Sequence, residues 1–255
     1  TGYRGYGPMK SGINHGDPIT GSHAAGVLMA ALRHRRLTGK GMYIDVSQQE
    51  SAVALMGPEV LAYQMTGEEP ERRGNRSGWY APANSYPCAG EDRWVTIAAT
   101  NEEQWQKLTQ AMSAAGLADN PHFATAEQRR ENHDELDRII SEWTISQEAY
   151  AVTHLLQAAG VPAGPVLRGP DLLADAHYKD RGTFVTVDHP QVGPKQYPGI
   201  PWRMSATPGR VRWPSPTLGQ HNRDVYGELL GLTGPEIDLL EKTGTIGTKP
   251  TGSRI

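Results

Sequence analysis

Apolar residues recur at helical spacing near the start of the chain. Between residues 17 and 37 they form one stripe, which comprises Ala24, Val27, Leu28, Ala31 and Leu32. Asp17 is a favoured N-cap, and Pro18 suits the first position of a helix. The basic run 33–36 follows at the end where the helix dipole favours positive charge. The pattern therefore predicts a helix from Asp17 to Leu37.

A short strand and a second helix are predicted next. The segment Met42–Val46 follows a Thr-Gly-Lys-Gly turn and contains aromatic and β-branched residues, which is typical of a strand. Ser47, with Glu50 three residues later, has the pattern of a capping box. The helix that Ser47 begins is expected to reach about Met65. Helix, turn, strand and helix in this order indicate an α/β fold.

The middle of the chain changes in composition. Gly, Pro, Arg, Asn and Ser dominate residues 67–86, which predicts a long loop, and such loops in compact domains are often functional. Arg93–Ala99 predicts a strand, and Val161–Val166 is expected to be a rigid extended segment. Between them the apolar spacing predicts three helices, over residues 102–115, 126–143 and 147–160.

The last part of the chain returns to mixed structure. Thr183–Val187 predicts a strand, and residues 190–219 are rich in Pro and Gly. Two short helices are expected near residues 222–230 and 235–243. We therefore expect three parts: residues 1–66 in a large α/β domain, residues 67–174 as linker and small α+β domain, and residues 175–255 as a return to the large domain with C-terminal helices.

Composition and charge argue against several classes of protein. The 255 residues have a net charge of −3, without the basic stripe that is typical of nucleic-acid binding. A single cysteine, Cys88, excludes an internal disulfide and suits a reducing, cytoplasmic setting. No apolar run reaches the ~18 residues that a membrane helix needs. The nine histidines show no metal-ligand spacing. We expect a cytoplasmic protein with no nucleic acid, no membrane and no metal among its partners.

Asp17 is the residue whose surroundings favour a catalytic role. It lies in Gly-Asp-Pro-Ile-Thr-Gly, residues 16–21, at a predicted helix N-terminus. An N-cap is the simpler interpretation. A nucleophilic carboxylate is the other, because the helix dipole favours the ionised form and the flanking glycines let a bulky ligand approach the backbone. The two interpretations are compatible, and local sequence does not choose between them.

The motifs of the chain resemble those of a known family. Residues 16–32, followed by Arg35, residues 38–41 and residues 44–47, are similar to the central signature of family III CoA-transferases, which include formyl-CoA transferase and carnitine CoA-transferase. Five further similarities follow in the family's order: Ser85–Cys88 with Asp92–Val95; Arg130, Asn132 and Leu136; Gly160–Val166; Asp175–His177 with Arg181–Gly182, where Ala176 departs from the usual Pro; and Leu218–Asn222, with two departures. The resemblance runs from about Gly5 to Gly244.

The resemblance implies a fold and an assembly. It implies a partial Rossmann-like large domain and a small α+β domain, with two chains interlocked as a homodimer. The family's first, Rossmann-like half, which makes most CoA contacts, has no counterpart in this sequence. The chain opens on a Gly- and Pro-rich segment, residues 1–8, with no predicted element before it. We therefore expect a missing N-terminal half, supplied upstream or by a partner.

The resemblance also implies a chemistry. The family aspartate falls on Asp17, which would attack the thioester of an acyl-CoA and pass through an aspartyl mixed anhydride and an aspartyl-CoA thioester. Coenzyme A thioesters are then substrates, together with a carboxylic acid acceptor. A glycine-rich loop closes over this aspartate in formyl-CoA transferase, and its best counterpart comprises Gly74, Asn75, Arg76, Ser77 and Gly78. Its backbone N–H groups could bind an oxyanion; an ordinary interdomain loop is the alternative.

Two other functions remain open. The α-methylacyl-CoA racemases share the family fold, but they place the aspartate before Phe-Gly-Gly-Gly, whereas Pro-Ile-Thr-Gly follows Asp17. They also carry a Glu after the small-domain strand, where this chain has Asn101. A non-catalytic half or subunit of such an enzyme is the third possibility. The sequence favours the transferase.

Overall fold

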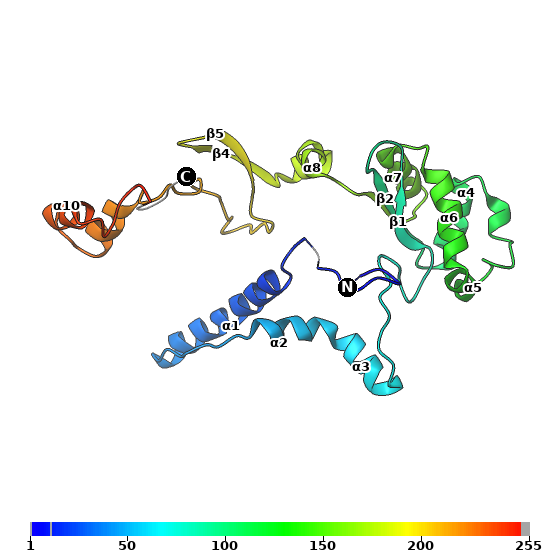
Figure 1. Ribbon diagram of the computed structural model, residues 1–255, viewed down its shortest axis with the longest axis horizontal. Coiled ribbons are helices and arrows are strands. Elements are labelled where there is room, and N and C mark those ends of the chain that lie inside the picture. The colour runs from blue at the N-terminus through cyan, green and yellow to red at the C-terminus, as the bar shows by residue number, and fades with distance from the viewer. Residues whose placement is uncertain (1, 11, 251–255) are drawn as a thin grey trace. The chain divides into compact units, whose positions relative to one another are not determined.

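The computed structural model describes residues 2–10 and 12–250 of the chain (Figure 1). It contains helices and antiparallel sheets, which confirms the predicted α/β class. The chain divides into two compact units, Thr1–Val166 and Leu167–Ile255. The predicted three-part division at residues 66 and 174 stays a prediction.

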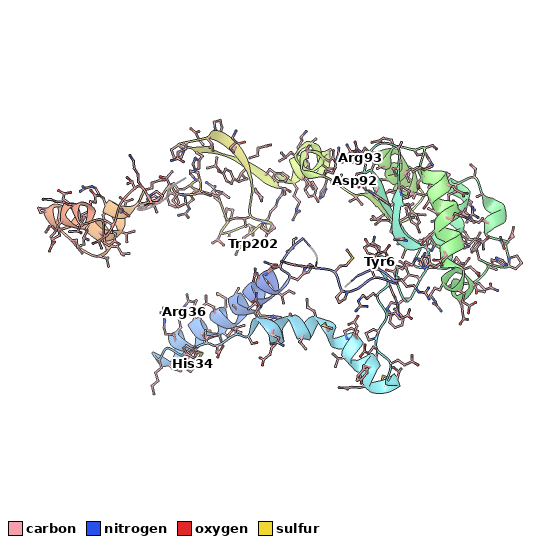
Figure 2. The ribbon with its side chains drawn as sticks, in the orientation of Figure 1. Tyr6, His34, Arg36, Asp92, Arg93 and Trp202 are labelled. Carbon is pink, nitrogen blue, oxygen red and sulfur yellow. The ribbon has the colours of Figure 1, made fainter. Side chains whose placement is uncertain are left out.

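The first unit begins with helices. The predicted helix is confirmed as α1, Gly16–Thr38, which ends at Gly39. Gly39 has φ 73°, and its N–H donates to the carbonyl of Arg35, which is the left-handed ending that glycine permits. His34 and Arg36 are exposed near this end of the helix (Figure 2). The basic residues therefore lie where solvent and the helix dipole both stabilise them.

The segment after α1 differs from the prediction in two ways. Met42–Val46 is irregular, because a strand needs a ladder partner and none of the described residues pairs with it; Tyr43 is 89% exposed. The long second helix is instead split into α2 (Gln48–Val53), the 3₁₀ turn η1 (Ala54–Met56) and α3 (Gly57–Thr66). Pro58 lies in the first turn of α3, where its missing N–H is tolerated; it could not continue the hydrogen bonding of α2.

A three-stranded antiparallel sheet follows, in the order β1-β2-β3. Its strands are β1 (Ala83–Pro87), β2 (Trp94–Ala98) and β3 (Ala163–Pro165). β2 confirms the predicted strand, and β3 lies inside the predicted extended segment. β1 was predicted as loop as far as residue 86. Its small and polar residues have low strand propensity, but pairing with β2 and the burial of Ala83 and Tyr86 override it.

Four helices belong to the same unit as this sheet: α4 (Glu102–Ala111), α5 (Ala126–Glu131), α6 (His133–Thr144) and α7 (Ala149–Ala158), with a 3₁₀ turn η2 at Ala115–Leu117. The predicted helix over 126–143 is broken at Asn132. The Asn132 side chain donates to the carbonyls of Gln128 and His122, so it ends α5 and lets α6 start in a new direction.

The hydrophobic core lies between this sheet and its helices. α6 packs on β1, and α7 packs on β2 and β3 (Figure 1). The largest fully buried side chains are Trp105, Tyr86, Phe123, Ile97, Leu108, Leu136, Ile140 and Leu156. Each such side chain contributes roughly 1.5–3 kcal/mol of burial free energy. This core therefore holds the segment before β1 and the N-terminus of α6 in fixed places.

The second unit contains short helices α8 (Gly169–Ala174) and α9 (Ala176–Arg181), a hairpin, and two terminal helices. The hairpin strands are β4 (Phe184–His189) and β5 (Gly193–Pro198). β4 overlaps the predicted strand, whereas β5 lies in the Pro- and Gly-rich stretch, where no strand was predicted. The terminal helices are confirmed as η3, a π-helix at Asp224–Leu229, and α10, Gly234–Lys242.

Candidate functional site

Asp17 lies in the first turn of α1. The residue at the N-cap position is His15, whose backbone is already helical, so the prediction that Asp17 caps the helix is wrong. The chain turns earlier than expected because the N–H of Asp17 donates to the carbonyl of Asn14 at 3.1 Å. The carboxylate is therefore free of the capping role. It is exposed, and it still lies where the helix dipole favours a negative charge.

A polar side chain from α2 contacts this carboxylate. Nε2 of Gln48 donates a hydrogen bond to Oδ1 of Asp17. Gly16 lies between the two helices, and a Cβ at this position would be 3.1 Å from both Cγ and Nε2 of Gln48. A glycine at residue 16 therefore leaves room for the Gln48 side chain to cross toward α1.

An open hollow lies in front of the carboxylate, with a volume of about 500 Å³. Its lining consists of Met9, Lys10, Ile13, Asn14, His15, Gly16, Asp17 and Gln48. Lys10 is a cation in this wall, so the hollow suits an anionic ligand beside the carboxylate. An exposed, oriented carboxylate next to such space can act as a nucleophile.

The contacts of the predicted substrate loop, Gly74–Gly78, are with residues other than Asp17. The N–H of Gly74 donates to the carbonyl of Gly2 at 3.0 Å. Gly74 has φ 62°, and a Cβ there would lie 2.6 Å from the ring of Tyr3, so only glycine fits. Nδ2 of Asn75 donates to Oγ of Ser85 at 3.4 Å. The loop therefore lies against the N-terminal segment and β1.

The other two residues of the loop stabilise its turn. Oγ of Ser77 accepts from the N–H of Trp79 at 3.0 Å. Gly78 lies so close to the Arg73 guanidinium that a Cβ there would collide with it. Both contacts stay within the loop or its immediate neighbours, so they set its conformation locally.

Arg76 anchors this loop to α6. Its guanidinium donates to Oδ2 of Asp137 from Nε at 2.9 Å and from Nη2 at 2.6 Å, and Nη1 pairs with Asp134 at 2.6 Å. Asp137 also accepts from Asn84 at 2.9 Å and from the Tyr86 hydroxyl at 2.8 Å. Burial, and then the Asp137 charge, raise the pKa of Tyr86 well above its usual 10.0. The loop is thus held by a buried carboxylate whose partners are all in place.

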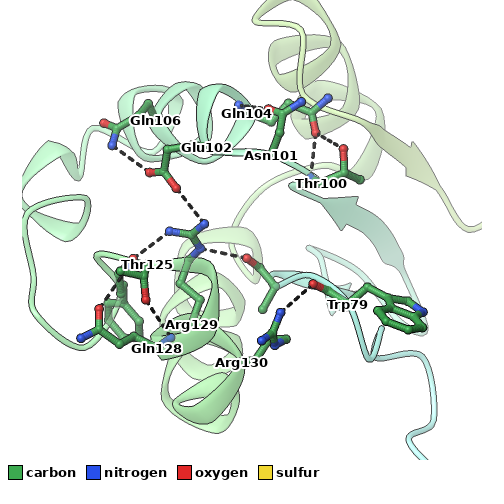
Figure 3. A network of polar contacts seen from close by, with 12 residues as sticks. Trp79, Thr100, Asn101, Glu102, Gln104, Gln106, Thr125, Gln128, Arg129 and Arg130 are labelled. Carbon is green, nitrogen blue, oxygen red and sulfur yellow. Dashed lines mark hydrogen bonds and ion pairs between the residues drawn. The ribbon is translucent and has the colours of Figure 1, made fainter.

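A second buried network was missed by sequence reasoning. The Arg129 guanidinium lies 4.9 Å from the Trp105 ring and donates to the carbonyls of Ala81 at 3.1 Å and Phe123 at 2.9 Å (Figure 3). It also pairs with Glu102 at 2.9 Å. Arg130, the residue quoted in the motif, is instead exposed and donates to the Trp79 carbonyl. Local spacing gives no signal for Arg129, because α5 ends at Glu131 and the groups that compensate its charge come from other segments.

Asn101 occupies the position where the racemases carry a glutamate. Its Oδ1 accepts from the N–H of Gln104 at 2.9 Å, so it caps α4. Within the described residues there is no group of three or more His, Cys, Asp and Glu side chains that could hold a metal ion. No helix in the described part of the chain has both the length and the hydropathy to cross a bilayer.

Comparison with known proteins gives the family. The sequence model of CoA-transferase family III matches residues 1–222. The chain belongs to CoA-transferase family III. It is 36% identical over 241 residues to succinyl-CoA–D-citramalate CoA-transferase of Chloroflexus aurantiacus, covering 94% of this chain and 60% of the relative. It is 31% identical over 261 residues to formyl-CoA:oxalate CoA-transferase of Streptomyces avermitilis, covering 96% and 63%.

A solved structure supports the same family. A CaiB/BaiF family protein from Brucella suis matches with a TM-score of 0.77 at 30% identity, over 90% of this chain and 59% of that one. The predicted family III CoA-transferase fold is therefore confirmed. The chain spans about 60% of the length of the curated relatives that it matches.

Proposed function

We propose that this family III protein transfers coenzyme A from an acyl-CoA donor to a carboxylic acid, with Asp17 as the nucleophile. The observation that carries the proposal is the exposed Asp17 carboxylate, oriented by Gln48 at the mouth of an open hollow. Family membership and the CoA-transferase names of the relatives agree with it. Their named reactions suggest succinyl-CoA and formyl-CoA as first donors to test, and citramalate and oxalate as first acceptors.

The proposed reaction begins with Asp17. One carboxylate oxygen attacks the thioester carbonyl, the C–S bond breaks, and the CoA thiolate leaves an aspartyl-acyl mixed anhydride. The thiolate then attacks Cγ of Asp17, which forms an aspartyl-CoA thioester and releases the donor acid. The acceptor carboxylate attacks the same carbon, the C–S bond breaks, and a second mixed anhydride forms between Asp17 and the acceptor acid. The released thiolate attacks the acceptor carbonyl carbon, which forms the new acyl-CoA and expels the Asp17 carboxylate. This series of covalent steps divides one difficult transfer into easier ones.

The loop Gly74–Gly78 is proposed as the substrate loop. Backbone N–H groups of a fixed loop can stabilise the oxyanion of the attacked thioester. The Arg76 contacts to Asp134 and Asp137 hold the loop in one conformation, which suits preorganised donors. We also propose that the enzyme works as a homodimer and that further sequence supplies most CoA contacts. The exposed apolar side chains on α1 and α3 support this assembly.

Replacement of Asp17 by Asn tests the proposal. The amide oxygen can still accept from Gln48, so the site keeps its shape, but an amide does not form the anhydride. We expect turnover to fall by several orders of magnitude with normal folding, because covalent catalysis has no substitute here. Hydroxylamine added with the acyl-CoA donor should inactivate the original protein and modify Asp17. The matched control, Glu59→Gln on exposed α3, should keep full activity. Near-normal turnover of Asp17→Asn would refute the role.

A racemase is the competing activity, and it is separated by isotope exchange. A racemase moves the proton beside the thioester carbonyl, so it would exchange that proton with solvent in D₂O. A transferase moves coenzyme A between two acids and leaves the C–H bond intact. We expect CoA transfer without deuterium incorporation into a chiral α-methylacyl-CoA, measured by mass spectrometry.

A further inference from the structure

The start of α2 fixes where Gln48 lies. Ser47 is the N-cap of α2, and its Oγ accepts from the N–H of Glu50 at 3.2 Å. The Ser47 carbonyl accepts from the N–H of Ser51 at 3.1 Å and from its hydroxyl at 2.8 Å. Gln48 is therefore the first residue of a well-capped helix, and α2 packs against α1.

The contact between Gln48 and Asp17 leaves one oxygen available. Nε2 of Gln48 donates to Oδ1 of Asp17, while Oδ2 has no hydrogen-bond partner among the residues that the structure describes. Gly16 has no side chain, so it leaves room for the Gln48 side chain at this place. The two oxygens of one carboxylate are thus made different, because only Oδ1 is held by Gln48 within the described residues, and both residues line the hollow.

We infer that Gln48 is a catalytic residue that orients Asp17 and then stabilises negative charge on Oδ1 during transfer. The inference rests on the proposed function of Asp17. In the first step the open oxygen, Oδ2, attacks the donor thioester while Gln48 holds Oδ1. An amide is a neutral donor, so it orients the carboxylate without the full charge neutralisation of a Lys or Arg partner.

The second step makes the stronger demand on Gln48. After acylation Oδ1 is the carbonyl oxygen of the aspartyl half of the mixed anhydride. When the CoA thiolate attacks Cγ, its electron pair forms the C–S bond and the carbonyl pair moves onto Oδ1. The electron pair on Oδ1 then re-forms the carbonyl, the C–O bond breaks, and the donor acid leaves with the negative charge. Gln48 already points its N–H at this oxygen, as an oxyanion donor must.

The test compares Gln48→Met with the wild type in the complete protein. Methionine keeps the length of the side chain but has no N–H, so Oδ1 loses its donor. We expect kcat to fall about 100-fold, the size typical of one oxyanion donor. The KM for the acyl-CoA donor should stay within about twofold, because the donor binds without this hydrogen bond. Quenched reactions analysed by mass spectrometry should show the aspartyl mixed anhydride accumulating, since its conversion to the thioester is the step that slows.

Two further variants keep the inference falsifiable. Gln48→Glu should lose at least as much activity, because a second carboxylate cannot donate and repels Asp17. Gln49→Met changes the next residue, which does not line the hollow, and should keep wild-type kinetics. A Gln48→Met protein with kcat within twofold of wild type, or with lower activity but no anhydride, overturns the role of Gln48. A wild-type protein that neither transfers CoA nor becomes modified at Asp17 instead overturns the proposed function.

Discussion

Asp17 shows how far a single residue can be predicted. Its place at the start of a helix followed from Pro18 and the apolar stripe, and α1 confirms it. Its contact with Gln48 could not be predicted, because the two are 31 positions apart and the packing of α2 on α1 brings them together. The catalytic role of Asp17 stays a prediction that the kinetic experiments address.

His133 has the opposite surroundings to Asp17. It is 6% exposed, and its Nε2 lies 3.5 Å from Oδ1 of Asp137, too long for a good hydrogen bond. Burial lowers the pKa of His133 below its usual 6.5, with Arg76 acting in the same direction. The charges of Asp137 and Asp134 oppose this and do not reverse it. The folded protein therefore keeps this imidazole neutral at a pH where the unfolded chain binds a proton.

The sign of the resulting pH effect follows by linkage. Above pH 6.5 His133 is neutral in both states and contributes no pH dependence. As the pH falls below 6.5 the unfolded state takes up a proton first, so the free energy of unfolding decreases until the folded state is protonated as well. We expect His133→Gln to flatten this decrease, measured by urea unfolding between about pH 7.5 and 5.5, where most carboxylates stay ionised. His122→Gln, at an exposed histidine, should retain the decrease; equal profiles for wild type and His133→Gln would contradict the prediction.

At the scale of elements, helices were predicted better than strands. α1, α7 and α10 lie where helices were predicted, because the pattern that predicts a helix resides in its own segment of the sequence. β1 and β5 were missed and Met42–Val46 was overpredicted, because a strand depends on a partner elsewhere in the chain. Arg129 was missed for a related reason. Its charge is compensated by groups from three other segments, which no local pattern displays.

Arg129 gives a prediction about how the elements of the small domain are held together. Its side chain is 3% exposed and connects α5 with Ala81, Phe123 and Glu102. Arg129→Met leaves two backbone carbonyls without their donors, so we expect a loss of about 3–5 kcal/mol in the free energy of unfolding. Arg130→Met, at the exposed neighbouring position, should cost less than about 1 kcal/mol. Urea unfolding measures both, and equal losses would show that Arg129 is not the organising residue.

For the molecule as a whole, resemblance was more informative than pattern. The family and its fold are confirmed over residues 1–222, whereas hydrophobic periodicity alone indicated only an α/β class. The exposure of apolar side chains is a further property of the molecule, which neither the resemblance nor the periodicity showed. α1 and α3 contain no buried residue, and among the described residues of the second unit Ile237 is the one buried apolar side chain. Exposed apolar side chains that gather on one helix face are typical of sites that bind other protein surface.

The last prediction concerns the exposed apolar face of α3. On α3, Leu61 and Met65 are 57% and 78% exposed and lie one helical turn apart, so they present one apolar face. We expect the complete protein to be a dimer by light scattering. The double variant Leu61→Lys with Met65→Lys should lose dimer mass and CoA transfer together, because burying two ammonium groups without partners is prohibitive. Gln64→Lys, at an exposed polar position of the same helix, should keep both. A monomeric wild-type protein, or a double variant that remains a dimer, would show that this face of α3 is not a dimer interface.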